Sequence, residues 1–256
     1  MAHDFRLYAH RGCPTELPEN TLPAFQRAVD LGVDALEMDV HLTRDGHPLV
    51  SHDPDATRMG DRAVAWRDLD LRDAQAIDLG AGFTDAAGGR PFAGRGFRAP
   101  TLDEVLTAFP TVRLNVDVKQ WQPPMVRPLL ALLRRRKAEH RVTLASFRAR
   151  TLLAVRRLGY GGETALAQTE VAAFVALPRR VIRALPFVGT AAQVPTHAGP
   201  LRFDRRGFID RCHELGLRVD FWTIDDPAEA RRLIGLGADG IMTDEPARMA
   251  PALTAR

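Results

Sequence analysis

The sequence is poor in cysteine and lacks long apolar runs, and each shortage excludes a class of protein. Its 256 residues contain only two cysteines, Cys13 and Cys212, which are far apart in the chain. This spacing suits neither a disulfide framework nor a cysteine metal site, so we expect two free thiols in a reducing compartment. No run of about 18 apolar residues is present, which argues against a membrane-spanning helix.

Lysine is also scarce, since Lys119 and Lys137 are the only two, and a lysine within a motif is therefore notable. The 35 basic and 32 acidic residues leave a formal charge of only +3. The basic pI of about 9.3 reflects the arginines, so it does not indicate a nucleic-acid partner. The first twelve residues are polar and lack the apolar core of a signal peptide, so we expect a soluble, cytoplasmic protein.

Short apolar runs alternate with helical patterns along the whole chain, which is typical of a parallel α/β protein. The runs predict eight strands, at residues 6–9, 35–40, 113–118, 142–145, 164–167, 191–194, 219–222 and 240–243. Helical patterns lie at residues 21–31, 102–109, 125–137, 148–158, 171–185, 205–215, 228–236 and 247–253. Eight strands in a chain of this length predict one domain, 1–256, with a TIM (β/α)8 barrel fold.

One segment interrupts this alternation. Residues from about 53 to 100 are first charged and then rich in glycine, and they are too many for an ordinary loop. We interpret them as an insertion after the second strand that lies over the C-terminal mouth of the barrel, where loops carry function.

Carboxylates alternate with apolar residues in two of the predicted strands. Glu37 and Asp39 would share the inner face of one strand, and Asp117 and Lys119 would share the inner face of the next. Carboxylates held close together repel one another unless a cation lies between them, and oxygen ligands suit Mg²⁺, Ca²⁺ or Mn²⁺. Lys119 could neutralise a substrate phosphate or form a structural salt bridge.

Two histidines fall at the ends of predicted strands. His10 precedes Arg11, and His52 follows a short apolar run. Histidine can take or give a proton near neutral pH, and the planar guanidinium of arginine suits phosphate oxygens. A histidine at such a place is more often structural, but two of them at strand ends favour a catalytic role.

The sequence resembles the glycerophosphodiester phosphodiesterase family. The resemblance extends from the first predicted strand to the last, through His10-Arg11-Gly12, Pro18-Glu19-Asn20, Leu36-Glu37-Met38-Asp39-Val40, Ser51-His52-Asp53, Leu114-Asn115-Val116-Asp117-Val118-Lys119, Ser146-Phe147, Phe221-Trp222-Thr223-Ile224-Asp225 and Thr243-Asp244-Glu245-Pro246. It implies a TIM barrel with an insertion after the second strand, as the strand pattern also indicates.

The resemblance also implies roles for individual residues. It makes Glu37 and Asp39 ligands of one divalent cation, with Asp117 as a third candidate, and His10 and His52 an acid/base pair. Arg11 and Lys119 would contact the phosphate, Trp222 would line the glycerol side, and Glu19 and Asn20 would support the first loop. The family usually has glutamate at the position of Asp117, which leaves open direct or water-mediated ligation and the identity of the metal: Mg²⁺, Ca²⁺ or Mn²⁺.

The implied activity is metal-dependent hydrolysis of a glycerophosphodiester to an alcohol and glycerol phosphate. A first alternative is a lysophospholipase-D-like reaction on a lysolipid, because residues 171–187 combine apolar residues with arginines as a membrane-surface helix does. We favour a barrel helix there, since Pro178 would break such a surface. A second alternative is a catalytically silent barrel that binds phosphodiesters. The sequence does not indicate an oligomeric state.

Overall fold

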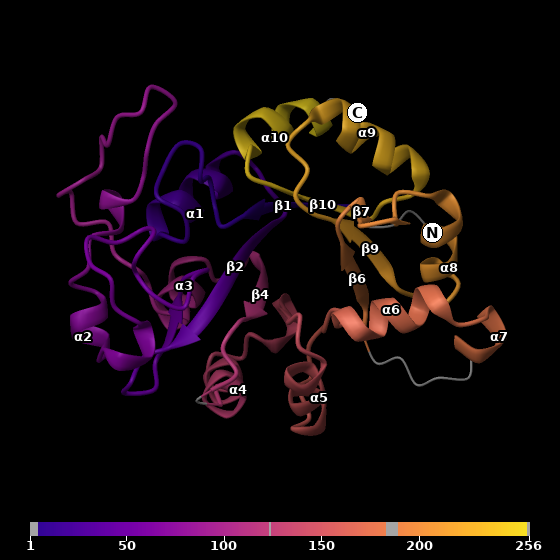
Figure 1. Cartoon of the computed structure of the whole chain (residues 1–256), viewed down its shortest axis with the longest axis horizontal. Helices are drawn as coiled ribbons and strands as arrows, with labels where there is room; N and C mark the ends of the chain where they lie inside the picture. The colour runs from indigo at the N-terminus through magenta and orange to yellow at the C-terminus, as the bar shows by residue number, and fades with distance from the viewer. Residues whose placement is uncertain (1–4, 123, 183–188, 255–256) are drawn as a thin grey trace.

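The computed structural model of the protein describes residues 5–122, 124–182 and 189–254. A curled parallel sheet forms its centre, in the order β5-β4-β2-β1-β10-β9-β6 (Figure 1). These strands are β1 Arg6–His10, β2 Ala35–Leu42, β4 Arg113–Val118, β5 Val142–Ala145, β6 Ala191–Val194, β9 Arg218–Phe221 and β10 Gly240–Thr243. All neighbours on this path pair in parallel, as the predicted TIM barrel requires.

The fifth of the eight predicted strands, 164–167, is much shorter than expected. Thr164 pairs with Leu144 at the end of the sheet formed by β5, and Ala165 pairs with Ala191 of β6, each as a single bridge. The chain leaves the sheet there because Ala167 is already the N-cap of the next helix. These two bridges connect the ends of the sheet, so the barrel closes with one very short member.

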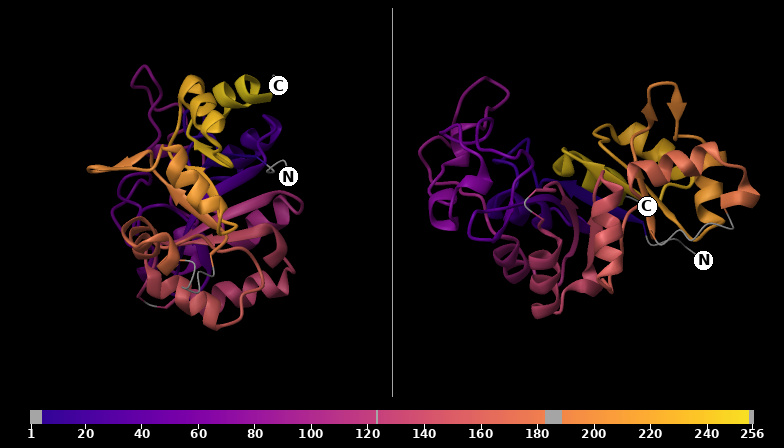
Figure 2. Two further views of the ribbon diagram at one scale, coloured as in Figure 1. Left: turned by 90° about the vertical axis from the view of Figure 1, so that its right-hand side faces the viewer. Right: turned by 60° about the horizontal axis from the view of Figure 1, so that its bottom comes forward.

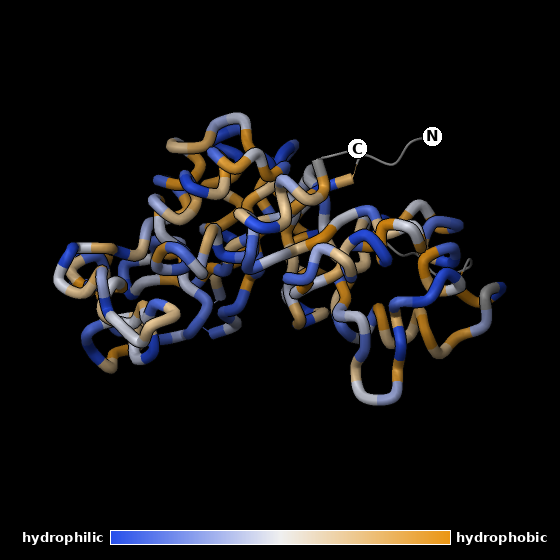
Figure 3. The backbone as a smooth tube through the Cα atoms, turned by 90° about the horizontal axis from the view of Figure 1, so that it is seen from above, coloured by the Kyte–Doolittle hydropathy of each residue, from blue (hydrophilic) through white to orange (hydrophobic). Residues whose placement is uncertain are grey.

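Helices surround the sheet and alternate hydrophobic with hydrophilic residues (Figure 3), as expected for helices with one buried face. They are α1 Leu22–Asp30, α3 Leu102–Ala108, α4 Val126–Arg135, α5 Ala149–Arg157, α6 Gln168–Ala176, α7 Arg179–Ile182, α8 Arg206–His213, α9 Pro227–Leu236 and α10 Pro246–Thr254. Local signals set their ends. Asp226 caps α9 at its N-terminus, and Gly237 ends it with a left-handed φ of 107°.

The predicted helix 171–185 is wrong as a continuous element. α6 begins earlier, at Gln168, and ends before Pro178, which separates it from the short α7. Val171 and Phe174 of α6 are buried in the apolar core, as the barrel-helix interpretation expects. Residues 183–185 of the predicted helix lie outside the described residues.

Residues 48–100 form a compact unit beside the strands. β3, Pro48–Val50, pairs antiparallel with β2, and the unit continues with the 3-10 turns Trp66–Asp68 and Leu79–Ala81 and with α2, Leu71–Ala74. It has its own apolar core, which consists of Leu49, Ala56, Trp66, Ala74, Ile77, Leu79 and Ala99. In Figure 1 this unit lies at the left, away from α6 to α8.

A small hairpin extends from the other side of the molecule (Figure 2). It consists of β7, His197–Ala198, and β8, Leu201–Arg202, and its strands are exposed. Cys13 and Cys212 are both free and buried, in agreement with the predicted thiols. Across the described ranges, none of the helices is long and apolar enough to cross a membrane.

Candidate active site

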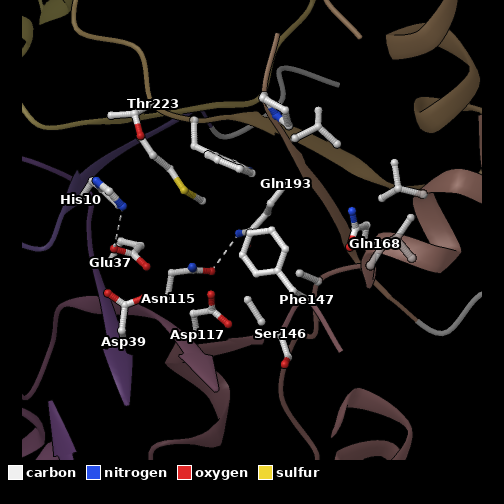
Figure 4. Close-up of a pocket in the computed structure, with 18 of the residues that line it drawn as sticks. His10, Glu37, Asp39, Asn115, Asp117, Ser146, Phe147, Gln168, Gln193 and Thr223 are labelled. Carbon is white, nitrogen blue, oxygen red and sulfur yellow. Dashed lines mark hydrogen bonds and ion pairs between the residues drawn. The ribbon is translucent and has the colours of Figure 1, made fainter. Parts of the chain in front are cut away.

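A cavity of about 430 Å³ opens at the carboxyl ends of the strands, where TIM barrels hold their active sites. Its polar wall comes from β1 to β4 and their loops (Figure 4). The residues of this wall are His10, Arg11, Glu37, Asp39, His52, Asn115, Asp117 and Lys119. Seven predicted site residues are therefore brought together, and Trp222, the eighth, lines the same cavity.

The carboxylates share one wall because of the strand register. Glu37 lies beside Asn115 and Asp39 beside Asp117 in the parallel pairing of β2 with β4. Alternate residues of a strand face the same side, so these side chains point into the barrel, while the residues between them pack outward in the core. Glu37, Asp39 and Asp117 are all buried.

Lys119 is the cation that separates two of these carboxylates. Its Nζ lies 2.9 Å from Oδ1 of Asp39 and 2.7 Å from Oδ2 of Asp117. Burial alone would lower the pKa of Lys119, but Asp117 and Asp39 outweigh burial and raise it, so the ammonium stays charged. The predicted salt bridge is thus present, alongside any contact that Lys119 makes with phosphate.

One ammonium does not neutralise the whole cluster. Oδ2 of Asp39 and Oδ1 of Asp117 are buried without a hydrogen-bond partner. Burial, and then the charge of Asp39, raise the pKa of Glu37 to about 8, so a proton competes for this carboxyl. Buried carboxylate oxygens without partners are what a hard divalent cation binds, so the donor set fits such an ion.

The cluster is nevertheless not arranged as a complete metal site. Of the residues that the structure describes, no three His, Cys, Asp or Glu side chains form a group that could hold a metal ion. The ammonium of Lys119 lies between Asp39 and Asp117 and binds one oxygen of each, so only the second oxygen of each carboxylate is left for an ion.

His10 is oriented by a carboxylate from the last strand of the barrel. Its Nδ1 donates to Oδ1 of Asp244 over 2.7 Å, and its Nε2 lies 3.8 Å from Oε2 of Glu37. Burial lowers the pKa of His10, but the charges of Glu37 and Asp244 outweigh burial and raise it above its ordinary value. His10 therefore presents Nε2 to the cavity with a tendency to hold a proton.

His52 has a similar partner in the residue that follows it. Its Nδ1 donates to Oδ1 of Asp53 over 2.9 Å, so Nε2 is the nitrogen left for chemistry. The carbonyl of His52 accepts a hydrogen bond of 3.1 Å from Nε2 of His41, a buried β2 residue that serves as scaffold. Both candidate catalytic histidines are thus held by an aspartate, as in many acid/base pairs.

Arg11 follows β1 in a left-handed conformation, with φ of 59°. Its backbone N–H donates to the backbone oxygen of Glu37, and its Nε lies 3.5 Å from Oδ2 of Asp39. Gly12 must follow it, because a Cβ there would meet the backbone of Ala24 at 2.8 Å. The guanidinium therefore stands at the edge of the carboxylate cluster, where a phosphate oxygen could bind.

The rest of the cavity lining, which we call the apolar wall, is largely apolar. Its apolar side chains are Ala145, Phe147, Ala165, Leu166, Val171, Val194, Pro195, Ala198, Phe203, Trp222 and Met242. Trp222 packs edge-on against Phe147, with ring centroids 5.9 Å apart. Gln193 crosses the cavity floor and donates to Asn115 over 2.8 Å (Figure 4).

Sequence reasoning gave no role to several residues that shape this site. Asp53 and Asp244 orient the histidines; each closely follows the end of a strand and lies in a motif shared with the family, but the motifs alone did not indicate this role. Leu166 and Phe203 line the apolar wall without any motif that marks them. His197, which follows β6 closely, is exposed on β7 and does not line the cavity.

Comparison with known proteins agrees with this geometry. The model of the glycerophosphoryl diester phosphodiesterase family matches residues 10–248. A glycerophosphodiester phosphodiesterase of Caldanaerobacter subterraneus is 30% identical over 254 residues, with 93% of each chain covered. The human lysophospholipase D GDPD1 is 27% identical over 265 residues, which cover 94% of this chain and 83% of that protein.

Solved structures of this family have a similar fold. The glycerophosphoryl diester phosphodiesterase domain of a Mycobacterium tuberculosis protein superposes with a TM-score of 0.82 at 22% identity, covering 99% of this chain and 100% of that one. The match of the family model covers nearly the whole chain, including every site residue described above. The chain belongs to the glycerophosphoryl diester phosphodiesterase family, whose members are phosphoric diester hydrolases.

Proposed function

We propose that the protein hydrolyses glycerophosphodiesters to an alcohol and glycerol phosphate, with His10 and His52 as the acid/base pair. The observation that carries the proposal is the pair of aspartate-held histidines that line one cavity together with the carboxylate cluster. A phosphodiester resists hydrolysis because its negative charge repels nucleophiles and its leaving alkoxide is poor. The site therefore needs positive charge and two proton carriers.

The chain supplies positive charge through Arg11 and Lys119, which line the same polar wall. We propose that Glu37, Asp39 and Asp117 also hold one divalent cation, Mg²⁺ or Ca²⁺ first and Mn²⁺ next. Such an ion supplies Lewis-acid stabilisation of the phosphoryl oxygens when it is bound. The buried oxygens of Asp39 and Asp117 that accept no hydrogen bond support this assignment, because a cation could bind them.

The two histidines would divide the proton transfers. One removes the proton of the glycerol 2-hydroxyl, whose oxygen attacks phosphorus, while the other protonates the departing alkoxide as its P–O bond breaks. Water then opens the resulting cyclic phosphate, with the proton transfers reversed, and glycerol phosphate is released. Attack by water instead of the 2-hydroxyl would use the same two residues. Trp222 would line the glycerol side of the cavity.

A substrate panel tests the proposal directly. Purified protein, freed of metal and then supplied with Mg²⁺, Ca²⁺ or Mn²⁺, should release glycerol phosphate from glycerophosphodiesters only in the presence of an ion. Turnover that is unchanged by EDTA would overturn the metal assignment while leaving the histidine pair. A protein that binds these diesters but never turns them over would be the catalytically silent barrel.

A lysophospholipase-D-like reaction is a second candidate, supported by the apolar wall of the cavity. Leu166, Val171 and Phe203 could accommodate the chain of a lysolipid, whereas a short alcohol such as choline or ethanolamine gives them nothing to bind. The human relative named lysophospholipase D supports this candidate. Turnover of a lysolipid compared with its deacylated diester separates the two reactions.

Cellular location and partners remain predictions from the sequence. We propose a cytoplasmic protein that acts on a small-molecule glycerophosphodiester or lysolipid and does not bind nucleic acid. Contact with a membrane surface is less favoured, because α6 ends before Pro178 and buries Val171 and Phe174 instead of presenting them.

A further inference from the structure

Arg58 lies in the loop after His52 and joins two carboxylates that stand behind the cavity. Its Nε donates to Oδ2 of Asp53 over 2.6 Å, and its Nη2 and Nη1 donate to Glu19 over 2.6 and 3.0 Å. Asp53 in turn accepts from His52, and Glu19 accepts from Nη1 of Arg11 over 3.3 Å. The Arg58 guanidinium thus connects Asp53, which holds His52, with Glu19, which binds Arg11.

The segment that carries Arg58 is firmly held by its own packing. Ala56 is fully buried, and the N–H of Gly60 donates to its carbonyl over 2.7 Å. Gly82 lies against the backbone of this segment so closely that a Cβ there would meet Cα of Met59 at 2.3 Å. The guanidinium is therefore presented from a fixed backbone.

Arg58 does not reach the reacting groups itself. The residues that line the cavity include His52 and Arg11 but not Arg58, Asp53 or Glu19. Its effect on the reaction must pass through the two carboxylates, and its side chain is 46% exposed on the outer side. A direct contact with substrate is thus not what keeps Arg58 in this position.

Arg58 is a cationic partner of both Asp53 and Glu19, and its removal would leave each carboxylate with fewer hydrogen-bond donors. Without it, Glu19 would have Arg11 as its remaining cationic partner in this network, and a bidentate pair would draw that guanidinium away from the cavity. Asp53 would lose the bond that fixes its second oxygen and could rotate away from His52. A lysine cannot replace the planar fork that serves both carboxylates at once.

We infer that Arg58 is a positioning residue that holds His52 and Arg11 in register through Asp53 and Glu19. This inference rests on the proposed function for its kinetic test but not for its spectroscopic one. Outer partners of this kind change activity by about 10- to 100-fold when removed. The loss should appear in kcat, because His52 is no longer held by Asp53, and also as a higher KM, because Arg11 is drawn away from the phosphate.

The kinetic experiment compares Arg58→Ala, Arg58→Lys and the unmodified protein on one glycerophosphodiester with saturating metal. We expect Arg58→Ala to lower kcat by about 30-fold and to raise KM as well, and Arg58→Lys to recover only part of both losses. Added guanidinium ion at millimolar concentration should restore activity to Arg58→Ala, since the exposed site is open to it. Unchanged kcat in Arg58→Ala would overturn the inference.

Arg44→Ala is the matched control. Arg44 also makes a bidentate pair with a carboxylate, donating to Asp70 over 2.9 and 2.7 Å, and it holds the same unit of residues 48–100. It has no link to His52 or Arg11 in its contacts with Asp70 and the carbonyl of Asp68. Equal loss of kcat in both variants, without rescue by guanidinium, would show a general loosening of this unit and would refute the positioning role.

A measurement without turnover separates this inference from the proposed function. The ¹⁵N signals of the His52 ring report which nitrogen carries the proton. Arg58→Ala should shift them from a single tautomer, protonated at Nδ1, toward a mixture, and Arg44→Ala should leave them unchanged. If the protein is inactive on every diester but Arg58→Ala shifts the ring signals, the proposed function is wrong and the inference stands. If the ring signals are unchanged in Arg58→Ala, the inference is wrong whatever the activity.

Discussion

The two walls of the barrel mouth differ in almost every physical property although they face the same cavity (Figure 4). The wall from β1 to β4 carries two histidines, three carboxylates, an arginine and a lysine. The apolar wall, from β5 to β10, carries mostly apolar side chains together with the polar Gln168 and Gln193. One closed sheet thus gathers charged and titratable side chains on one wall and mostly apolar side chains on the other.

The difference has a local origin in each wall. In the first, polar residues recur at every second position of β2 and β4, so charge accumulates on the inner face. In the second, the sheet is reduced to single bridges at Thr164 and Ala165, and α6 follows at once. Side chains of a helix and of the loop after β6 then complete the cavity where a strand would otherwise lie.

The largest effect should come from the histidines of the polar wall. His10→Ala and His52→Ala should each lower kcat by about 10³-fold, within the range of general acid–base catalysis. His213 forms a similar pair, with Asp239 at 2.8 Å, but outside the cavity, so His213→Ala serves as the control in the same assay. Near-normal turnover of either cavity variant, with circular dichroism showing an intact fold, would remove that histidine from the pair.

The next effect concerns the cation of the polar wall. Lys119→Met should lower kcat/KM by about 100-fold, because it removes a positive charge beside the phosphate and leaves Asp39 and Asp117 facing one another. Lys137→Met is the matched control, because it removes the same charge at a lysine outside the cavity. Equal activity of the two variants would show that Lys119 is only structural.

The apolar wall should give a smaller effect, visible with one class of substrate. Phe203→Ala should raise KM for a lysolipid by about 10-fold, because it removes apolar surface that its chain would cover, and should leave the deacylated diester unaffected. Leu153→Ala, at an exposed leucine, is the control. If both substrates are affected alike, the two walls do not divide chemistry from binding, and the comparison drawn above is wrong.

The smallest effect is expected at the third carboxylate. Asp117→Glu should change kcat less than about 5-fold while altering the order of preference among Mg²⁺, Ca²⁺ and Mn²⁺, because a longer side chain changes how its oxygens reach an ion. Activity of each variant over a titration of the three ions measures this. An unaltered order would indicate that Asp117 does not ligate the ion.

The polar wall could be predicted from sequence because its signals are local. Alternation along one strand places Glu37 with Asp39, and alternation along the next places Asp117 with Lys119, so strand geometry alone assembles the cluster. The parallel α/β fold followed from the repeated apolar runs for the same reason. The sequence could not show whether Lys119 binds the two aspartates or a phosphate, because the answer depends on the conformation of its side chain.

The remaining features depend on contacts between distant parts of the chain. Asp244 reaches His10 only because β1 and β10 are neighbours in the closed sheet. Phe203 belongs to a loop that has no periodic pattern, and the early start of α6 overrode the strand propensity of residues 164–167. The role of Arg58 is invisible in sequence, because its two carboxylates lie on separate loops.

The ammonium of Lys119 has a further consequence for the stability of the protein when the proposed ion is absent. A cluster of buried carboxylates with no positive partner would open the barrel mouth by mutual repulsion. The Lys119 ammonium reduces this repulsion, because it is part of the chain and stays in place when the medium contains no metal. Chelation should thus abolish activity without unfolding the protein, and adding the ion back should restore activity.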